Sequence, residues 1–226
     1  MVQDIRLLFA EPYETVREDC HLVKEPNLET ITKWAEKMVA ALPQKTVLVP
    51  VPGHTGIATD TKILAEHIVA EASWAVLPKD IIILDCLTSK PRRSLCEMKK
   101  EGYPVKGLNL GIHLVYKSAR PILKTYLNDG YKLILIDNVI DTGTTIRNCI
   151  SALGHDAGVL CIGDTGAWRQ DPYEISSEKK KEFSSTTELL SEIDRLESER
   201  ILYRIENYFT PDNKRKYVLT EITQAR

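Results

Sequence analysis

The sequence predicts an α/β fold built on a parallel sheet. Apolar runs without polar alternation occupy 46–51, 81–87 and 133–136, and helical patterns alternate with such runs between residues 45 and 165. Uninterrupted apolar strands lie where a sheet is covered on both faces. Strands that alternate with helices form parallel sheets through right-handed crossovers. We therefore expect four or five parallel strands with flanking helices, and 133–136 at the centre.

Composition excludes several classes of protein. The chain has 226 residues, of which 43% are apolar and 27% charged, and its net charge is −2. Such a chain buries a core as a single domain over 1–226, and it is neither disordered nor a globally basic nucleic-acid binder. It contains no membrane-spanning apolar run, no signal peptide and no CxxC pair. We therefore expect a cytoplasmic protein with reduced thiols and without zinc.

The expected elements follow in chain order. The first half holds strands at 5–9 and 21–23, a helix over 28–41, a strand at 46–51, a helix over 57–70 and a strand at 81–87. The second half holds a strand at 113–116, a helix over 121–127, the strand at 133–136, a helix ending at 153 and a strand at 159–163. Beyond residue 171 we expect a polar loop over 176–185, a charged helix over 187–200 and a hairpin of 203–209 with 216–222.

The stretch Tyr131–Ser151 organises the chain. Its apolar run ends in Asp137 and Asn138, and the loop Asp141–Thr145 then leads into a helical pattern. Gly143 permits unusual backbone angles, and the threonines add hydroxyl donors. A helix N-terminus carries unpaired N–H groups and about half a positive charge. The unit suits a phosphate, with an acidic strand tip placed for hydroxyls or a metal, although an ordinary strand-to-helix turn has the same appearance.

The segment LILIDNVIDTGTT resembles the signature of the type I phosphoribosyltransferases, which bind phosphoribosyl pyrophosphate (PRPP). That signature consists of an apolar run, two acidic residues, a short apolar step and a loop rich in threonine and glycine. Asn138 stands where the second acidic residue is expected. The resemblance spans residues 45–165, which would form the PRPP-binding core of the type I fold. It implies magnesium-dependent displacement of pyrophosphate from PRPP by a nitrogen nucleophile.

Carried over by position, the resemblance assigns three catalytic residues: Asp137, Asn138 and Asp141. Asp137 and Asn138 would meet the ribose hydroxyls, and Asp137 would meet Mg²⁺ indirectly, through PRPP. The 5′-phosphate would lie on Asp141, Thr142, Gly143, Thr144 and Thr145. Because an amide carries no charge, we expect slow turnover, and Asn138→Asp should raise pyrophosphate release more than it tightens PRPP binding.

A second glycine loop follows the first core strand. VPVPGHTG resembles the pyrophosphate loop of the family, which implies that the pyrophosphate meets Pro52, Gly53, His54, Thr55 and Gly56. The VPVP opening is similar to the ComF-like branch. That branch usually continues with Arg-Gly-Phe-Asn, whereas Gly56-Ile57-Ala58 stands here. A plain strand-to-helix turn with prolines is the alternative interpretation.

The family places a mobile basic loop between its second and third core strands. Residues 88–106 hold six Lys/Arg and two Glu, so the resemblance implies a lid whose cations are Lys90, Arg92 and Arg93. A closing lid excludes water and donates cationic hydrogen bonds to a leaving group. A solvated charged surface is the alternative.

The chain ends supply the remaining expectations. Trp168 and Arg169 follow the last core strand, where a loop of the family contacts the nucleobase; packing of Trp168 beneath the C-terminal segment is an equal alternative. Residues 1–27 and 166–226 would form the variable hood that this family carries over the carboxyl edge of its sheet.

These features predict a Mg²⁺-dependent phosphoribosyltransferase, a pentosyl-transferring glycosyltransferase of nucleotide metabolism that binds PRPP or a nucleoside monophosphate. The nitrogen acceptor and the pathway are not identified by the sequence, and a homodimer is one open oligomeric state. Membrane binding and nucleic-acid binding are not expected. Two alternatives remain, a non-catalytic PRPP or nucleotide sensor and a ComF-like protein of DNA metabolism.

Overall fold

The computed structural model describes residues 5–74, 78–169, 175–183, 185–198, 202–209 and 215–224. The chain divides into two compact units, whereas the sequence predicted a single domain. The first unit comprises Met1–Glu101 and Val105–Gln170, and the second comprises Gly102–Pro104 and Asp171–Arg226.

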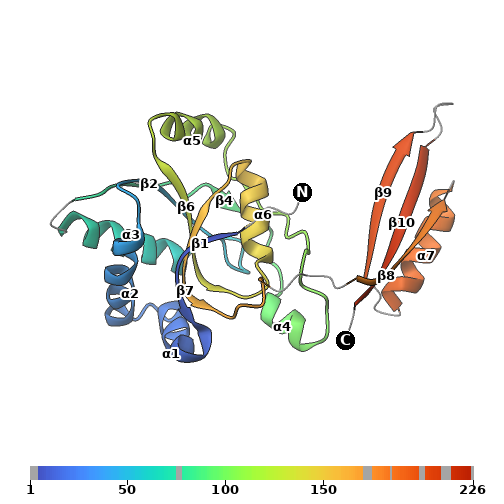
Figure 1. The fold of residues 1–226 in the computed structure, drawn as a ribbon, viewed down its shortest axis with the longest axis horizontal. Helices are drawn as coiled ribbons and strands as arrows, with labels where there is room; N and C mark the ends of the chain where they lie inside the picture. Colours follow the sequence, from blue (N-terminus) through green and yellow to red (C-terminus); the bar gives the residue numbers. More distant parts are fainter. Residues whose placement is uncertain are drawn as a thin grey trace. The chain divides into compact units, whose positions relative to one another are not determined.

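The first unit is built on a five-stranded sheet in which every neighbouring pair of strands is parallel (Figure 1). The order is β1-β7-β6-β2-β3, with β1 at Arg6–Pro12, β7 at Gly158–Asp164, β6 at Lys132–Ile140, β2 at Lys45–Pro50 and β3 at Asp80–Ile83. In the register, Val47 lies beside Leu133 and Leu135 lies beside Val159. The prediction of four or five parallel strands with 133–136 at the centre is confirmed.

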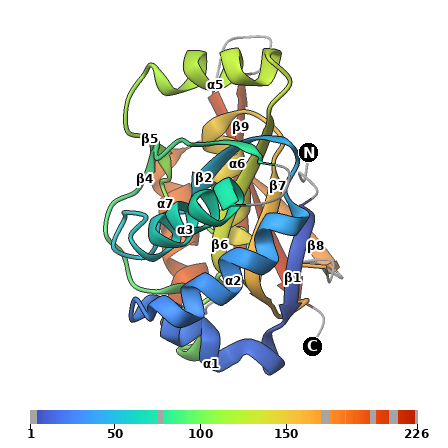
Figure 2. The same cartoon turned by 90° about the vertical axis from the view of Figure 1, so that its left-hand side faces the viewer.

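Helices cover both faces of this sheet. One face carries α1 (Tyr13–Lys24), α2 (Leu28–Ala41) and α3 (Asp60–Trp74), as Figure 2 shows, and the other carries α5 (Ala119–Asn128) and α6 (Thr144–Leu153). Successive residues of a strand point to opposite faces. Ile134 and Ile136 therefore pack with the first group, and Leu133 and Leu135 with the second. Among the described residues, no helix is long and apolar enough to cross a membrane.

The beginning of the chain belongs to the sheet. Residues 1–27 were expected in a hood, but Arg6–Pro12 forms the edge strand β1, which pairs with β7. The expected strand at 21–23 is also wrong, because these residues lie in α1, whose buried residues Val16, Cys20 and Val23 recur at helical spacing. The hood prediction is therefore incorrect for the described part of this segment.

The expected strand at 113–116 lies outside the parallel sheet. β5 (His113–Leu114) pairs antiparallel with β4 (Leu87–Thr88), and the fifth parallel strand is β1 instead. Between them lies the short helix α4 (Leu95–Lys100), which begins with a capping box of Ser94 and Glu97. Because the capping box satisfies N–H groups that a short helix leaves unpaired, it favours a helix inside the basic segment.

The second unit has an antiparallel sheet of three strands in the order β8-β10-β9. Its elements are β8 (Ile175–Phe183), α7 (Thr186–Ser198), β9 (Leu202–Phe209) and β10 (Arg215–Gln224). The predicted hairpin is confirmed, since β9 and β10 pair antiparallel. The polar loop expected over 176–185 is wrong, because most of it is β8, which pairs with β10 along its length. A hood role for residues 166–226 stays a prediction.

Candidate functional site

Both glycine loops lie at one edge of the parallel sheet. β2 and β6 are adjacent and parallel, so the loops that follow them leave the sheet at neighbouring carboxyl ends. The Val51 N–H donates to the Ile136 carbonyl at 3.0 Å, which keeps the strands together to the point where the loops begin. The first loop enters α3 and the second enters α6. Ligands of open α/β sheets bind outside this edge.

The loop before α6 turns on Gly143. Gly143 has a φ of 72°, in the left-handed region that glycine adopts without steric cost. A Cβ at this position would lie 2.6 Å from Ile5 Cδ1 and 2.8 Å from Arg147 Nη1. Arg147 also donates to the Thr142 carbonyl at 2.8 Å, and Thr145 is half-buried. The loop is closely packed, and glycine is the residue that fits its turn.

Thr144 joins this loop to a distant part of the chain. Its side chain is buried, with 1% exposed. The Thr144 hydroxyl donates to the Val105 carbonyl at 2.8 Å and accepts from the Gly107 N–H at 3.3 Å. It also lies 2.9 Å from the Thr142 hydroxyl. The segment after α4 therefore lies against the start of α6, and a phosphate at the loop would meet it there.

Both carboxylate oxygens of Asp141 have partners. Oδ2 accepts from Lys99 Nζ at 2.8 Å, and Oδ1 accepts from the Thr165 hydroxyl at 2.8 Å. Lys99 belongs to α4, inside the predicted lid, yet it was not among the cations expected to act. The Lys99 and Asp141 side chains are 53% and 37% exposed, so the ion pair contributes at most about 1 kcal/mol to stability. Lys99 does, however, balance the negative charge of Asp141, the first residue of the loop before α6.

Asp137 is a half-buried carboxylate of β6, directly after Ile136, the last residue of this strand that pairs with β2. Its Oδ1 accepts from the Asn138 N–H at 2.7 Å. Burial raises the pKa of Asp137 to about 6, although backbone hydrogen bonds from Asn138 and Val139 and the charge of Lys24 lower it. The positive charge of Arg92 also acts on this carboxylate. Asp137 is therefore mostly ionised at neutral pH, but it lies within reach of protonation.

The side chain of Asn138 does not lie beside that of Asp137. β6 continues to Ile140, so the side chains of Asp137 and Asn138 point to opposite faces. Asn138 is 3% exposed, and its Nδ2 donates to Asp60 Oδ2 at 3.1 Å. Among the described residues, its Oδ1 has no hydrogen-bond partner. Strand alternation therefore separates the side chains of Asp137 and Asn138, which were both expected to meet the ribose hydroxyls.

The loop after β2 is shaped by its own hydrogen bonds. The residues predicted to meet pyrophosphate divide into the buried Pro52 and Gly56 and the exposed Gly53, His54 and Thr55. The Gly53 N–H donates to the Ile57 carbonyl at 3.0 Å, and the Gly56 N–H to the Gly53 carbonyl at 3.1 Å. Gly56 has a φ of 91°, and a Cβ there would lie 2.1 Å from the Ser89 carbonyl oxygen. Two of the expected backbone donors are therefore used within the loop.

Of the three predicted lid cations, Arg92 reaches the site. Its N–H donates to the His54 carbonyl at 2.8 Å, which ties it to the loop after β2. Burial lowers the pKa of its guanidinium, while the charge of Asp137 opposes that change. Its Nε is buried without a hydrogen-bond partner among the described residues. Lys90 is exposed, and Arg93 pairs with Glu101 instead.

Trp168 and Arg169 are held together by Asp164, which sequence reasoning did not single out. Asp164 Oδ1 accepts from Trp168 Nε1 at 2.8 Å, and its Oδ2 lies 2.5 Å from Arg169 Nη1. The Arg169 guanidinium stacks 4.5 Å from the centre of the Trp168 ring. Trp168 also packs against the core, with its Cβ 3.2 Å from where a Cβ on Gly143 would stand. Trp168 is thus both a packing residue and a neighbour of the loop Asp141–Thr145.

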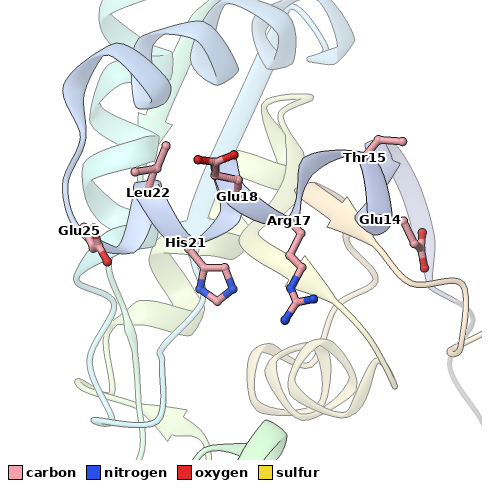
Figure 3. Close-up of a pocket in the computed structure, with 7 residues that line it drawn as sticks. All are labelled: Glu14, Thr15, Arg17, Glu18, His21, Leu22 and Glu25. Carbon is pink, nitrogen blue, oxygen red and sulfur yellow. The ribbon is translucent and has the colours of Figure 1, made fainter.

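The surface also has a hollow of about 520 Å³ that lies apart from these loops. Its seven lining residues all come from α1 and the residue after it, and Figure 3 shows Arg17 and His21 extending to the same side of the helix. Side chains along one helix do not converge on a ligand from several directions, as the walls of a binding pocket do. We assign this hollow no function.

Comparisons with known proteins add no assignment. No protein-family model matches the chain, no curated protein matches it, and no solved structure matches it.

Proposed function

We propose that this protein binds Mg²⁺-PRPP at the carboxyl edge of β2 and β6 and transfers its phosphoribosyl group to a nitrogen acceptor, with release of pyrophosphate. One observation carries the proposal. Two loops that need glycine backbones emerge from adjacent parallel strands, each enters a helix, and Asp137 lies in β6 directly after Ile136, the last residue that pairs with β2. A ligand with a phosphate at each end and a sugar between them suits this spacing of groups.

The loop 141–145 would receive the 5′-phosphate. The N-terminus of α6 offers backbone N–H groups and a positive dipole end to an anion. Because Asp141 is held by Lys99 and Thr165, its carboxylate is directed to those partners and its charge is balanced. The hydroxyl of Thr144 would have to exchange its bond to Val105 for one to the phosphate, so ligand entry would displace the segment after α4.

The loop after β2 would receive the pyrophosphate. Gly53, His54 and Thr55 form its exposed surface. Arg92 is bonded to this loop through His54, and its Nε lacks a partner among the described residues. A buried guanidinium donor without a partner is unfavourable, and pyrophosphate oxygens would satisfy it. Arg92 is therefore the lid residue that we expect to stabilise the leaving group.

Asp137 would meet the ribose. As a carboxylate it accepts hydrogen bonds from sugar hydroxyls, each worth about 1.5–3 kcal/mol when the acceptor is charged. Its negative charge also favours the positive charge that develops on the sugar ring as the bond to pyrophosphate breaks. This contribution requires the ionised form, so activity should fall as the pH drops through the pKa of about 6.

Mg²⁺ would arrive with the substrate. Among the described residues, no group of three His, Cys, Asp or Glu side chains could hold a metal ion. Mg²⁺ in phosphate sites is commonly held by one or two carboxylates, water and the phosphates of the substrate. The single carboxylate of Asp137 fits that arrangement, in which the ion screens the negative charge of the pyrophosphate.

The proposal also includes a specific assignment of the α/β fold. A parallel sheet with PRPP loops after adjacent strands, and a basic segment between β3 and β5, supports a type I phosphoribosyltransferase fold of the ComF-like kind. The second unit would then serve as the variable hood. A structure with bound Mg²⁺-PRPP would test both the fold assignment and the role of the second unit.

Calorimetry and a pyrophosphate-release assay test the function together. Wild-type protein should bind Mg²⁺-PRPP and ribose 5-phosphate, and it should release pyrophosphate from PRPP with at least one base or amine of a panel. Gly143→Val should abolish binding of both, because a side chain blocks the backbone from the phosphate. If the wild-type protein binds neither Mg²⁺-PRPP nor ribose 5-phosphate, the proposal is wrong.

A specific observation favours a second function, a PRPP sensor without turnover. The amide of Asn138 is occupied by Asp60, so one of the groups expected to act on the ribose is engaged elsewhere. Ground-state binding through the two loops does not need that group, whereas catalysis is weakened without it. Binding of Mg²⁺-PRPP with no pyrophosphate release for any acceptor would select the sensor.

A further inference from the structure

Residues 105–110 form a strap against the start of α6, and both belong to the first unit. The Val105 carbonyl accepts from the Thr144 hydroxyl at 2.8 Å, and the Gly107 N–H donates to the same hydroxyl at 3.3 Å. Asn148, which lies further along α6, binds the second half of the strap. Helical residues at this spacing lie on the same face of the helix. The strap is therefore fastened at two points on one face of α6.

Asn148 binds the strap with both ends of its amide. Its Oδ1 accepts from the Leu110 N–H at 2.9 Å, and its Nδ2 donates to the Leu108 carbonyl at 2.9 Å. Within the helix, Nδ2 also donates to the Thr144 carbonyl at 2.9 Å. An asparagine side chain offers a donor and an acceptor side by side, so one residue satisfies a backbone carbonyl and a backbone N–H of the strap at once. The proposed function gives Asn148 no contact with the ligand.

The fastened strap occupies a group that the ligand needs. In the proposed function, the Thr144 hydroxyl donates to an oxygen of the 5′-phosphate. In the structure it donates to the Val105 carbonyl instead, so a backbone oxygen takes the place of a phosphate oxygen. Because a hydroxyl has one hydrogen to donate, Thr144 can donate to the strap or to a phosphate, but not to both. The strap and the phosphate therefore compete for the loop before α6.

We propose that the strap of residues 105–110 is autoinhibitory: Asn148 locks it onto α6, and a phosphate binds at 141–145 only after the strap is released. This inference rests on the proposed function and adds a regulatory step to it. The strap is distinct from the action of the predicted lid, whose cations at 90–93 precede α4 and would close over a bound ligand. The strap follows α4, and it is closed before any ligand arrives.

Burial strengthens the fastened form of the strap. Val105 and Leu110 are 5% and 6% exposed, so release of the strap exposes apolar side chains in addition to breaking hydrogen bonds. The released strap is therefore the minor state. A ligand that binds only a minor state has an apparent affinity below its intrinsic affinity, in proportion to the fraction of protein in that state. A change that weakens the lock without touching the loop 141–145 should consequently tighten phosphate binding.

Calorimetry with ribose 5-phosphate tests the lock, because this ligand carries the phosphate but not the pyrophosphate that the lid would meet. Asn148→Ala removes both bonds to the strap and puts a good helix former inside α6. It should bind ribose 5-phosphate about tenfold more tightly than the wild-type protein, since tenfold corresponds to about 1.4 kcal/mol, within the net contribution of two hydrogen bonds. Asn109→Ala is the matched control. Asn109 is an exposed residue of the strap whose Oδ1 accepts from the Gly111 N–H at 2.9 Å, inside its own segment, so its loss should leave the affinity unchanged.

A second variant releases the strap without changing any side chain of α6. Gly107 has a φ of 74°, in the left-handed region that is unfavourable for other residues, so Gly107→Ala disfavours the fastened strap. It should also bind ribose 5-phosphate about tenfold more tightly than the wild-type protein. Gly130→Ala is its matched control, because Gly130 has a φ of 87° and a Cβ there would meet nothing within 4 Å. Gly130 precedes β6, at the opposite edge of the sheet, so this variant should leave the affinity unchanged.

Hydrogen exchange in the absence of ligand gives an independent measure of release. The amides of Gly107 and Leu110, which donate to Thr144 and Asn148, should exchange faster in Asn148→Ala than in the wild-type protein. If their exchange is unchanged, or if either variant folds but binds ribose 5-phosphate no more tightly than the wild-type protein, the inference is wrong. The proposed function then still stands, provided that the wild-type protein binds its ligands. If the wild-type protein and both variants bind neither ribose 5-phosphate nor Mg²⁺-PRPP, the inference and the proposed function are both wrong.

Discussion

The two glycines that flank α6 allow the packing of the loop before this helix to be measured. Gly143 and Gly154 have nearly equal φ angles, 72° and 74°. A Cβ at Gly154 would meet nothing within 4 Å, whereas one at Gly143 would lie 2.6 Å from Ile5 Cδ1 and 2.8 Å from Arg147 Nη1. Gly154→Ala therefore measures the free-energy cost of a left-handed backbone alone. Gly143→Ala measures that cost together with the cost of steric crowding.

The expected magnitudes follow from these distances. An L-residue in the left-handed region costs about 1–2 kcal/mol, which is the whole expected loss for Gly154→Ala. Overpacking a closely packed site adds about 1–3 kcal/mol, so Gly143→Ala should lose roughly 2–5 kcal/mol in total. The contacts at Gly143 include the ends of flexible side chains, which places the expected value in the lower half of that range.

Urea denaturation followed by circular dichroism gives the free energy of unfolding of both variants, and calorimetry gives their affinity for ribose 5-phosphate. Gly143→Ala should weaken binding as well as stability, because the added methyl group lies beside the backbone that approaches the phosphate. Gly154→Ala should leave binding unchanged, since it stands at the other end of the helix. Equal losses of stability in the two variants would refute the packing argument, and equal affinities would refute the placement of the phosphate.

Three further predictions concern charge and motion. Lys99→Met should weaken binding of ribose 5-phosphate, because it leaves the charge of Asp141 unbalanced. Lys100→Met removes the same charge from the adjacent residue and should leave the affinity unchanged. Equal affinities of the two variants in calorimetry would contradict this prediction. Hydrogen exchange of residues 88–108 should slow when Mg²⁺-PRPP is added, and unchanged exchange would mean that the segment is no lid. The pKa of Asp137 is about 6 in the folded protein and about 3.9 in an unfolded chain. Because the folded state therefore binds more protons between these two pH values, the free energy of unfolding should fall as the pH rises from 4 to 6. This fall should be on the order of 2 kcal/mol, and it should be absent from Asp137→Asn. Urea denaturation at several pH values measures it, and the same pH dependence in both proteins would contradict the assigned pKa.

The central part of the fold was predictable because its signal is local. The apolar run at 133–136 is buried on both faces, which is the environment that such a run indicates. The turn at Gly143 was predictable for the same reason, since a glycine between a strand and a helix has few other uses. In both cases the residues that determine the structure are neighbours in the sequence.

The edges of the sheet were not predictable in this way. β1 is half-buried over most of its length and pairs with a strand far along the chain, so its residues give no strong periodic signal of their own. The short strand at 113–116 gave a similar signal but joined β4 instead. Which of two short apolar segments completes a sheet depends on packing between distant residues, and that information is absent from either segment.

The partners of the site residues were missed for a related reason. Asp60 lies 78 positions from Asn138, and Lys99 lies 42 positions from Asp141. Asp60 fell inside the helix expected over 57–70 and was not singled out, and Lys99 was one of six cations in residues 88–106. Charge type alone could not separate Lys99 from the predicted Arg93, because Lys99 lies on α4 and reaches Asp141, whereas Arg93 precedes that helix and pairs with Glu101.

The position of β1 has a consequence for how the protein is made. Arg6 of β1 pairs with Gly158 of β7, so β1 leaves the ribosome long before the strand that neighbours it in the sheet. At about 5–20 residues added per second, the strand waits roughly 8–30 s for its partner. During that time Leu7 and Phe9 have no sheet to pack against, and an apolar segment with unpaired backbone groups can associate with other chains. Synthesis of this protein should therefore depend on a chaperone that shields nascent β1, more than synthesis of a chain whose neighbouring strands are close in sequence.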